Sequence, residues 1–225
     1  MMMPQQNPAN DFGPTAAMEI LELRARLLDR TRSFFADRGF LEVDTPLLSA
    51  DTVVDRHLDP FAVKVPGESA PRWLQTSPEF AMKRLLTSFP RPIYQICKAF
   101  RQDEAGPLHN PEFTMVEWYV PGDDMQAGIR LLSDLAEALL ARGSAEPISY
   151  ADAFAKFVGI DPHTTTVEIL ADAARSRCSA VPDSMDADDR DGWLDLLLVE
   201  LVQPQLGIGR PAILYDYPAS QAALA

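Results

Sequence analysis

The sequence predicts an α/β fold of the α+β kind, in which a mainly antiparallel sheet is flanked by helices. Residues 93–101 and 112–120 alternate between apolar and polar side chains on either side of a turn-forming segment, which is the pattern of a long β-hairpin. Apolar residues also recur at helical spacing in residues 18–35 and 125–140. Because 47% of the 225 residues are hydrophobic, the chain can bury a substantial core.

The N-terminal part is predicted to consist of a flexible lead, a helix and a short extended segment. Residues 1–14 are rich in Pro, Gln and Asn, which is typical of a frayed terminus. Thr15 is a plausible N-cap for an amphipathic helix that Gly39 ends. Residues 40–43 then extend, and Pro46 prevents a return to helix.

The next stretch predicts two paired strands followed by a second helix. Residues 61–65 alternate and end at a Pro-Gly turn, and residues 72–76 are the expected partner strand. The tripeptide Ser77-Pro78-Glu79 is typical of a helix start, with Ser as the N-cap and Pro at the first helical position. The buried side of this helix is predicted to consist of Phe80, Leu85 and Leu86.

Beyond the hairpin the pattern is mostly helical. Residues 123–142 form an amphipathic helix pattern, and a strand pattern appears at 211–217. Between them, shorter helical patterns occur at 148–159, 167–178 and 189–202. We therefore predict one domain over residues 15–225.

Charge and composition exclude several classes of protein. A formal net charge of −13 argues against a protein that grips nucleic acid over its whole surface, because phosphate binding is driven by basic patches. Cys97 and Cys178 are far apart and the three histidines are scattered, so a disulfide framework or a zinc site is not expected. Neither a long apolar span nor a signal segment opens the chain. These features predict a cytoplasmic protein without membrane association.

The predicted hairpin carries an unusual density of polar residues among aromatic and β-branched ones. Such a set is costly to fold unless the polar groups meet a ligand. This segment is therefore a candidate active site. Its polar residues are Arg101, Asp103, Glu104, His109, Asn110, Glu112, Glu117 and Tyr119.

The patterns F-R-x-[DE]-E and H-N-P-E-F-T-M-x-E-W-Y, at residues 100–104 and 109–119, resemble motif 2 of the class II aminoacyl-tRNA synthetases. The similarity is to the lysyl branch and, within it, to the elongation factor P (R)-β-lysine ligase family. The helix, strand and Pro46 upstream resemble motif 1, which builds the dimer interface in that family. The resemblance implies a class II synthetase-like catalytic domain over residues 15–225 that lacks the C-terminal motif 3 segment.

An ATP site is implied by the motif 2 residues. Arg101 is the expected catalytic residue, because its planar guanidinium can hold the α-phosphate at two oxygens. The resemblance places His109 and Asn110 at the phosphates and sugar of ATP, and Phe113 against adenine. Asp103 stands where the family has a Glu that meets the adenine amino group, so either Asp103 or Glu104 is expected there. Magnesium is expected to bridge the ATP phosphates, with its protein ligand unknown.

An amino-acid site follows partly from strand geometry. Alternation puts Phe113, Glu117 and Tyr119 on one face of the second hairpin strand. A carboxylate and a phenol suit an ammonium group, and in the lysyl branch these positions hold the lysine side chain. The resemblance also assigns Ser77 and Glu79 to the substrate's α- or β-amino group. The plainer interpretations are helix capping for Ser77 and Glu79, and a solvated sheet face for Glu117 and Tyr119.

Three functions are compatible with these residues. In the first, lysine or (R)-β-lysine is activated with ATP and joined to a lysine of elongation factor P. In the second, the chain is a catalytic core fragment of a lysyl-tRNA synthetase, although too few residues precede the motif 1 region for an oligonucleotide-binding barrel, which makes tRNA an improbable partner. In the third, it is a non-catalytic dimeric scaffold that binds nucleotide or amino acid. A homodimer is expected in each case.

Overall fold

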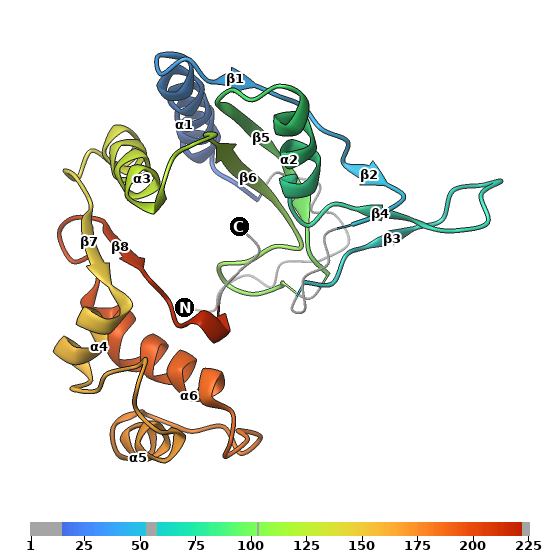
Figure 1. Ribbon diagram of the computed structural model, residues 1–225. Coiled ribbons are helices and arrows are strands. Elements are labelled where there is room, and N and C mark those ends of the chain that lie inside the picture. Colours follow the sequence, from blue (N-terminus) through green and yellow to red (C-terminus); the bar gives the residue numbers. More distant parts are fainter. Residues whose placement is uncertain (1–14, 53–57, 103, 222–225) are drawn as a thin grey trace, which may run out of the picture.

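The computed structural model describes residues 15–52, 58–102 and 104–221. The predicted N-terminal lead, residues 1–14, lies outside this range. At the centre is a sheet of three strands, in the order β1 (Leu41–Glu42), β5 (Ile93–Phe100) and β6 (Glu112–Tyr119). Helices α1 (Met18–Ala36) and α3 (Met125–Leu140) cover one face of this sheet, and α2 (Glu79–Ser88) lies on the other (Figure 1).

The predicted hairpin is confirmed, and it supplies two of the three strands of the central sheet. Strands β5 and β6 are antiparallel over their whole length, from the pair Ile93–Tyr119 to the pair Phe100–Glu112. Strand β1 adds to β5 in the parallel direction. The connection between β5 and β6 contains a tight turn in which the backbones of Gly106 and His109 bond to each other.

An aromatic core holds α1 and α3 against the sheet. Phe35 is completely buried and stacks on Tyr94 of β5, with ring centroids 4.4 Å apart. Val116 and Trp118 of β6 pack against the same cluster. Because side chains alternate along a strand, the odd-numbered residues of β6 must face away from this core, toward α2.

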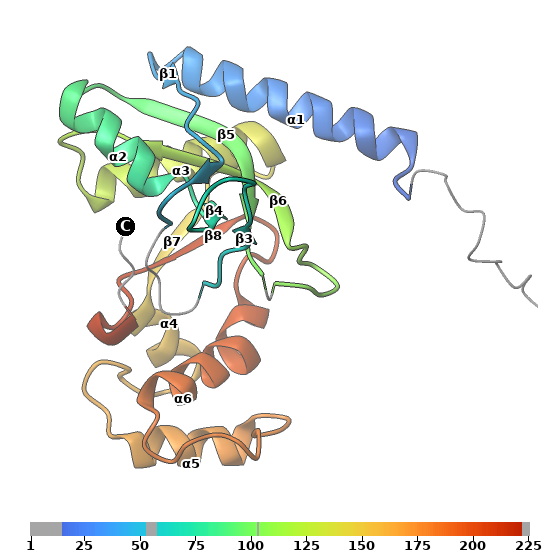
Figure 2. The same cartoon turned by 90° about the vertical axis from the view of Figure 1, so that its right-hand side faces the viewer.

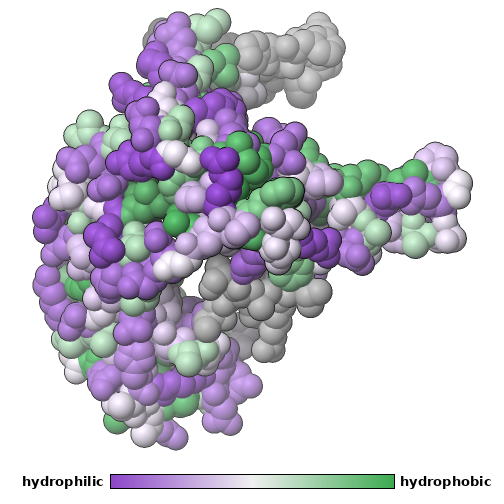
Figure 3. Space-filling view, turned by 45° about the horizontal axis from the view of Figure 1, so that its top comes forward, coloured by the Kyte–Doolittle hydropathy of each residue, from purple (hydrophilic) through white to green (hydrophobic). Residues whose placement is uncertain are grey.

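A second small sheet lies beside α2. It has the order β2 (Leu48–Ser49), β4 (Arg72–Leu74) and β3 (Ala62–Val63), and all its pairs are antiparallel. The predicted pairing of residues 61–65 with 72–76 is thus confirmed, although both strands are shorter than predicted. The hairpin of β3 and β4 projects from the body of the molecule and carries both hydrophilic and hydrophobic residues (Figures 1 and 3).

The C-terminal part has a core of its own. Helices α4 (Tyr150–Phe157), α5 (Val167–Arg177) and α6 (Arg190–Leu197) pack around buried Trp193 and Phe154, well apart from α1 in Figure 2. A π-helical turn, Leu198–Val202, continues α6. The strands β7 (Glu146–Ser149) and β8 (Ala212–Tyr215) form a parallel pair above these helices.

Several predicted element boundaries are wrong by a few residues. Residues 148 and 149 belong to β7 rather than to a helix, because Ser149 is the N-cap of α4 and accepts the backbone N–H of Asp152. Helix α1 starts after Ala17, so Thr15 is not its N-cap. Helix α2 starts at Glu79, with Pro78 as the N-cap, one residue later than predicted.

The predicted buried side of α2 is also partly wrong. Met82 and Glu79 are the buried residues of this helix, whereas Phe80 is 37% exposed and Leu85 and Leu86 are only partly buried. The buried face of α2 therefore combines an apolar residue, Met82, with a carboxylate, Glu79, and it is not the face that the predicted apolar residues define. Within the described parts of the chain, none of the helices is long and apolar enough to cross a membrane.

Candidate active site

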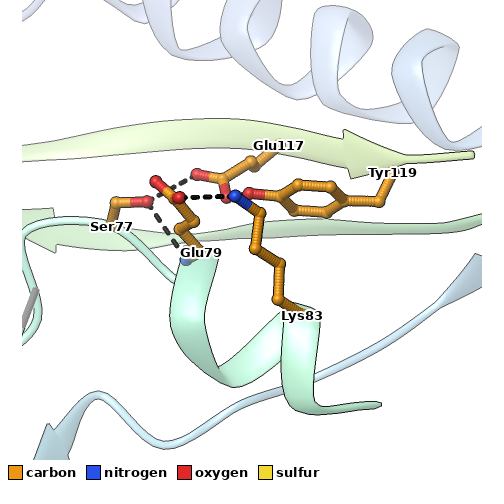
Figure 4. Close-up of polar contacts among 5 residues, drawn as sticks. All are labelled: Ser77, Glu79, Lys83, Glu117 and Tyr119. Carbon is orange, nitrogen blue, oxygen red and sulfur yellow. Dashed lines mark hydrogen bonds and ion pairs between the residues drawn. The ribbon is translucent and has the colours of Figure 1, made fainter. Parts of the chain in front are cut away.

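The candidate site lies between the start of α2 and the face of β6 that points away from the aromatic core. Ser77 and Glu79 come from the entrance and first turn of α2, and Glu117 and Tyr119 come from β6. Their side chains point toward one another, together with Lys83 from the next turn of α2 (Figure 4). The structure therefore brings together all four residues predicted to bind the amino acid.

The Glu117 carboxylate is held by two hydroxyl groups. The Ser77 hydroxyl donates to one carboxylate oxygen at 2.7 Å, and the Tyr119 hydroxyl donates to the other at 2.6 Å. Ser77 Oγ also accepts the backbone N–H of Glu79 at 3.1 Å, which ties the helix start to the strand. Hydrogen bonds to a carboxylate are stronger than neutral ones, so this acid is fixed in place without any ligand.

Glu79 is the most buried acid of the site and has a cation beside it. Glu79 as a whole residue is 9% exposed, and Lys83 Nζ lies 2.7 Å from Glu79 Oε1. The same ammonium lies 5.7 Å from the centroid of the Tyr119 ring, within the range of a cation–π contact. Lys83 was not among the predicted site residues, although its spacing of four residues from Glu79 along a helix is the signal that could have identified it.

The negative charge of the site contributes to raised pKa values of two neighbouring side chains, Tyr119 and Cys97. Burial, the hydrogen bond to Glu117 and the charges of Glu117 and Glu79 all raise the pKa of Tyr119 far above its usual value, so its phenol stays protonated and remains a donor. Cys97 of β5 lies on the same sheet face. Burial, and after it the negative charge of Glu117, raise the pKa of the Cys97 thiol to about 11. Such a field favours a cation.

Arg101 directly follows β5 and lies beside Phe113. The centre of its guanidinium is 5.2 Å from the Phe113 ring centroid, and Phe113 shares the sheet face of Glu117. Its Nη1 forms an ion pair with Glu104 Oε1 at 2.9 Å, and its Nε donates to the Thr76 carbonyl at 3.3 Å. Arg101 and Phe113, which were each predicted to bind ATP, are thus adjacent, and Glu104 occupies the guanidinium of Arg101.

The remaining predicted residues occupy the connection between β5 and β6. His109 and Asn110 are exposed in its turn, and the structure shows neither of them in contact with the carboxylate cluster. Asp103 lies outside the described residues. Glu104, the alternative to Asp103, is partly buried through its ion pair with Arg101.

A cavity of about 440 Å³ opens next to the cluster, between α2 and the segments on either side of β2. Of the predicted site residues it touches only Ser77, and its lining is mainly apolar. We place the candidate site at the carboxylates because they carry the charge that can recognise a ligand. Besides Ser77, the polar residues at the cavity wall are Asp44, Thr45, Ser49, Asp51, Thr52, Gln75 and Arg84.

Among the described residues, no group of three His, Cys, Asp or Glu side chains lies close enough together to hold a metal ion.

Comparison with known proteins assigns the chain to a family. Residues 5–222 match the family described as "tRNA synthetases class II (D, K and N)", and the chain belongs to this family. Among curated proteins it is 45% identical to a protein of Sodalis glossinidius over 216 residues and 43% identical to one of Proteus mirabilis over 220 residues. Both are named "Elongation factor P--(R)-beta-lysine ligase".

These alignments include nearly all of this chain but only about two thirds of each relative's length. They cover 94% of the chain and 66% of the Sodalis glossinidius protein, and 96% of the chain and 67% of the Proteus mirabilis protein. A relative from Actinobacillus succinogenes, with the same name, is also 45% identical. The resemblance inferred from the hairpin motif is confirmed.

Proposed function

We propose that this chain carries the amino-acid-activating site of an ATP-dependent ligase that joins (R)-β-lysine or lysine to a lysine of elongation factor P. The observation that carries the proposal is the carboxylate of Glu117, held ready by the hydroxyls of Ser77 and Tyr119. The names of the relatives support the same substrate and partner.

Recognition of the amino acid follows from charge and geometry. Two hydroxyl donors already hold the Glu117 oxygens, so an ammonium group can bind a carboxylate that needs no reorganisation. Tyr119 keeps its proton because its pKa is raised, and it therefore continues to orient Glu117 when a cation binds. In this proposal Glu117 and Tyr119 receive the side-chain ammonium, and Ser77 and Glu79 lie at the end of the substrate that carries the second amine.

The proposed activation step uses the nucleophile that the substrate brings. The amino-acid carboxylate attacks the α-phosphorus of ATP, an oxygen–phosphorus bond forms, and pyrophosphate leaves. The protein has to align the groups and neutralise charge. Arg101 suits this task because it lies beside Phe113, so that one end of a nucleotide can stack while a phosphate replaces Glu104 on the guanidinium.

Other parts of the nucleotide site are proposed on resemblance. His109 and Asn110 would contact the phosphates and sugar, and Asp103 or Glu104 the adenine amino group. Mg²⁺ would bind through the ATP phosphates and lower their charge.

We further propose that the chain acts as a cytoplasmic homodimer. Exposed apolar side chains of the motif 1 region support this, because Leu41, Leu47 and Leu48 are each at least 36% exposed. Exposed Ile20 and Leu21 on α1 extend the same kind of surface. Light scattering coupled to gel filtration measures the mass, and a monomer at micromolar concentration would contradict the proposal.

Amino-acid-dependent exchange of pyrophosphate into ATP tests the proposed activity. Lysine and (R)-β-lysine are compared on this chain and on a chimera that adds the remaining third of the Proteus mirabilis relative. Exchange that depends on either amino acid supports activation, and transfer to purified elongation factor P or to tRNA then identifies the acceptor. Absence of exchange in both proteins would contradict the proposal and favour a non-catalytic scaffold.

A further inference from the structure

The candidate site contains a cation of its own. Lys83 Nζ lies 2.7 Å from the carboxylate of Glu79, which is the acid proposed to meet the second amine of the substrate. Figure 4 shows that the Lys83 side chain reaches across the cluster toward Glu79 and the ring of Tyr119. The two carboxylates of Glu79 and Glu117 and the ammonium of Lys83 together leave one negative charge. Because Lys83 already pairs with Glu79, a second substrate amine would have to take the place of Lys83 at that carboxylate.

We propose that Lys83 is a specificity-determining residue that competes with the second amine of the substrate for Glu79. This inference rests on the proposed function and refines it. A substrate with two ammonium groups must displace Lys83 from Glu79, whereas an acid with only the distal ammonium binds at Glu117 and leaves the ion pair intact.

Differences in exposure make such a displacement feasible. The Glu79 side chain is 12% exposed and belongs to the first turn of α2, so it has little freedom to leave. The Lys83 side chain is 40% exposed, and its flexible stem can carry the ammonium into water. Because a buried carboxylate without a counter-charge is costly, Glu79 needs either Lys83 or a substrate amine beside it. When the substrate binds, the ion pair between Lys83 and Glu79 is thus replaced by one between the second substrate amine and Glu79. The second amine therefore adds little to the net binding affinity.

Binding measurements with two probes test this competition. (R)-β-Lysine carries two ammonium groups, and 6-aminohexanoate carries only the distal one. In the wild-type protein we expect calorimetric dissociation constants for the two probes within about tenfold of each other. In Lys83→Met, which keeps the length and apolar character of the stem but not the charge, the preference for (R)-β-lysine is expected to rise by about tenfold or more.

Thermal unfolding gives a second readout that a purely structural role would not produce. Lys83→Met leaves Glu79 without the Lys83 ammonium, so the melting temperature without ligand is expected to fall. At equal concentrations, (R)-β-lysine is expected to raise the melting temperature of this variant more than 6-aminohexanoate does, because only (R)-β-lysine brings an amine to Glu79. Lys83→Arg keeps the charge and is expected to behave like the wild type. The matched control is Lys98→Met, because Lys98 forms an ion pair of the same length, 2.7 Å, with Glu112 on the other sheet face.

The outcomes separate this inference from the proposed function. If neither probe binds the wild-type protein, the proposed function fails and the inference fails with it. If (R)-β-lysine binds but Lys83→Met leaves the preference unchanged, only the inference is overturned. A wild-type preference for (R)-β-lysine above about a hundredfold would also overturn it, and this measurement does not depend on the folding of any variant.

Discussion

Replacement of Glu117 by Gln tests the centre of the site with almost no change in shape. The glutamate accepts hydrogen bonds from Ser77 and Tyr119, one on each oxygen. In Glu117→Gln one oxygen becomes an amide NH₂, which cannot accept. One hydroxyl then faces a donor, and the negative charge that would attract an ammonium is gone.

The size of the effect follows from the contacts that are lost. A hydrogen bond to a charged group contributes about 1.5–3 kcal/mol. We expect the free energy of unfolding to fall by about 1–2 kcal/mol, because a hydroxyl can turn and accept from the new amide. The affinity for (R)-β-lysine or lysine should fall by roughly 10- to 150-fold, which is the same 1.5–3 kcal/mol expressed as a ratio of dissociation constants.

A matched control lies on the same strand. Glu112 is also in β6 but on the opposite face, where its half-exposed carboxylate pairs with Lys98 at 2.7 Å. An exposed ion pair contributes about 0–1 kcal/mol, so Glu112→Gln should leave amino-acid binding unchanged and cost little stability. Isothermal titration calorimetry and urea unfolding measure the two quantities for both variants.

Two results would refute this reasoning. Unchanged amino-acid affinity in Glu117→Gln, within a factor of about two, would show that the carboxylate does not receive the ammonium. An equal loss of affinity in Glu112→Gln would show that the effect is a general response to lost negative charge.

Three further predictions follow from other contacts. Arg101→Ala should abolish pyrophosphate exchange in any form of the protein that shows it while leaving the melting temperature nearly unchanged; normal exchange would contradict the assignment. Alkylation of Cys97, followed by mass spectrometry, should have a midpoint near pH 11, and Glu117→Gln should lower that midpoint. Because the folded pKa of Cys97 exceeds the unfolded value, its contribution to stability is complete below about pH 9 and is lost as the pH rises toward 11. Phe35→Ala should cost about 3–5 kcal/mol in urea unfolding, since the ring is fully buried, and a loss below about 1 kcal/mol would show that the aromatic core can collapse around the gap.

The hairpin and its two faces could be predicted because strand patterns are local. Successive side chains of β6 point to opposite faces, and the structure places Val116 and Trp118 in the core and Glu117 and Tyr119 in the candidate site. The corresponding prediction for α2, of its buried side from the spacing of apolar residues, was wrong. A helix pattern identifies its apolar side but not which side meets the sheet, and here Glu79 is buried while Phe80 is exposed.

The strands β7 and β8 show a second limit of sequence patterns. Residues 146–149 pair in parallel with residues 212–215, and neither segment contains information about so distant a partner. The predicted helix therefore began at residue 148, two residues before α4 begins, although residues 148 and 149 belong to β7 and Ser149 caps α4.

By itself, the sequence determined the hairpin and the sorting of its side chains, and through its motifs it indicated which residues to propose for binding a diamine acid. Only the tertiary structure decided how those residues meet. The hydroxyl of Ser77 reaches Glu117 across 40 residues of chain, and this contact exists because α2 packs on β6. The pairing of Lys83 with Glu79 likewise matters only because that packing places both beside Tyr119. Periodicity is a property of neighbours in the chain, whereas the charge balance of a site depends on which elements fold against each other.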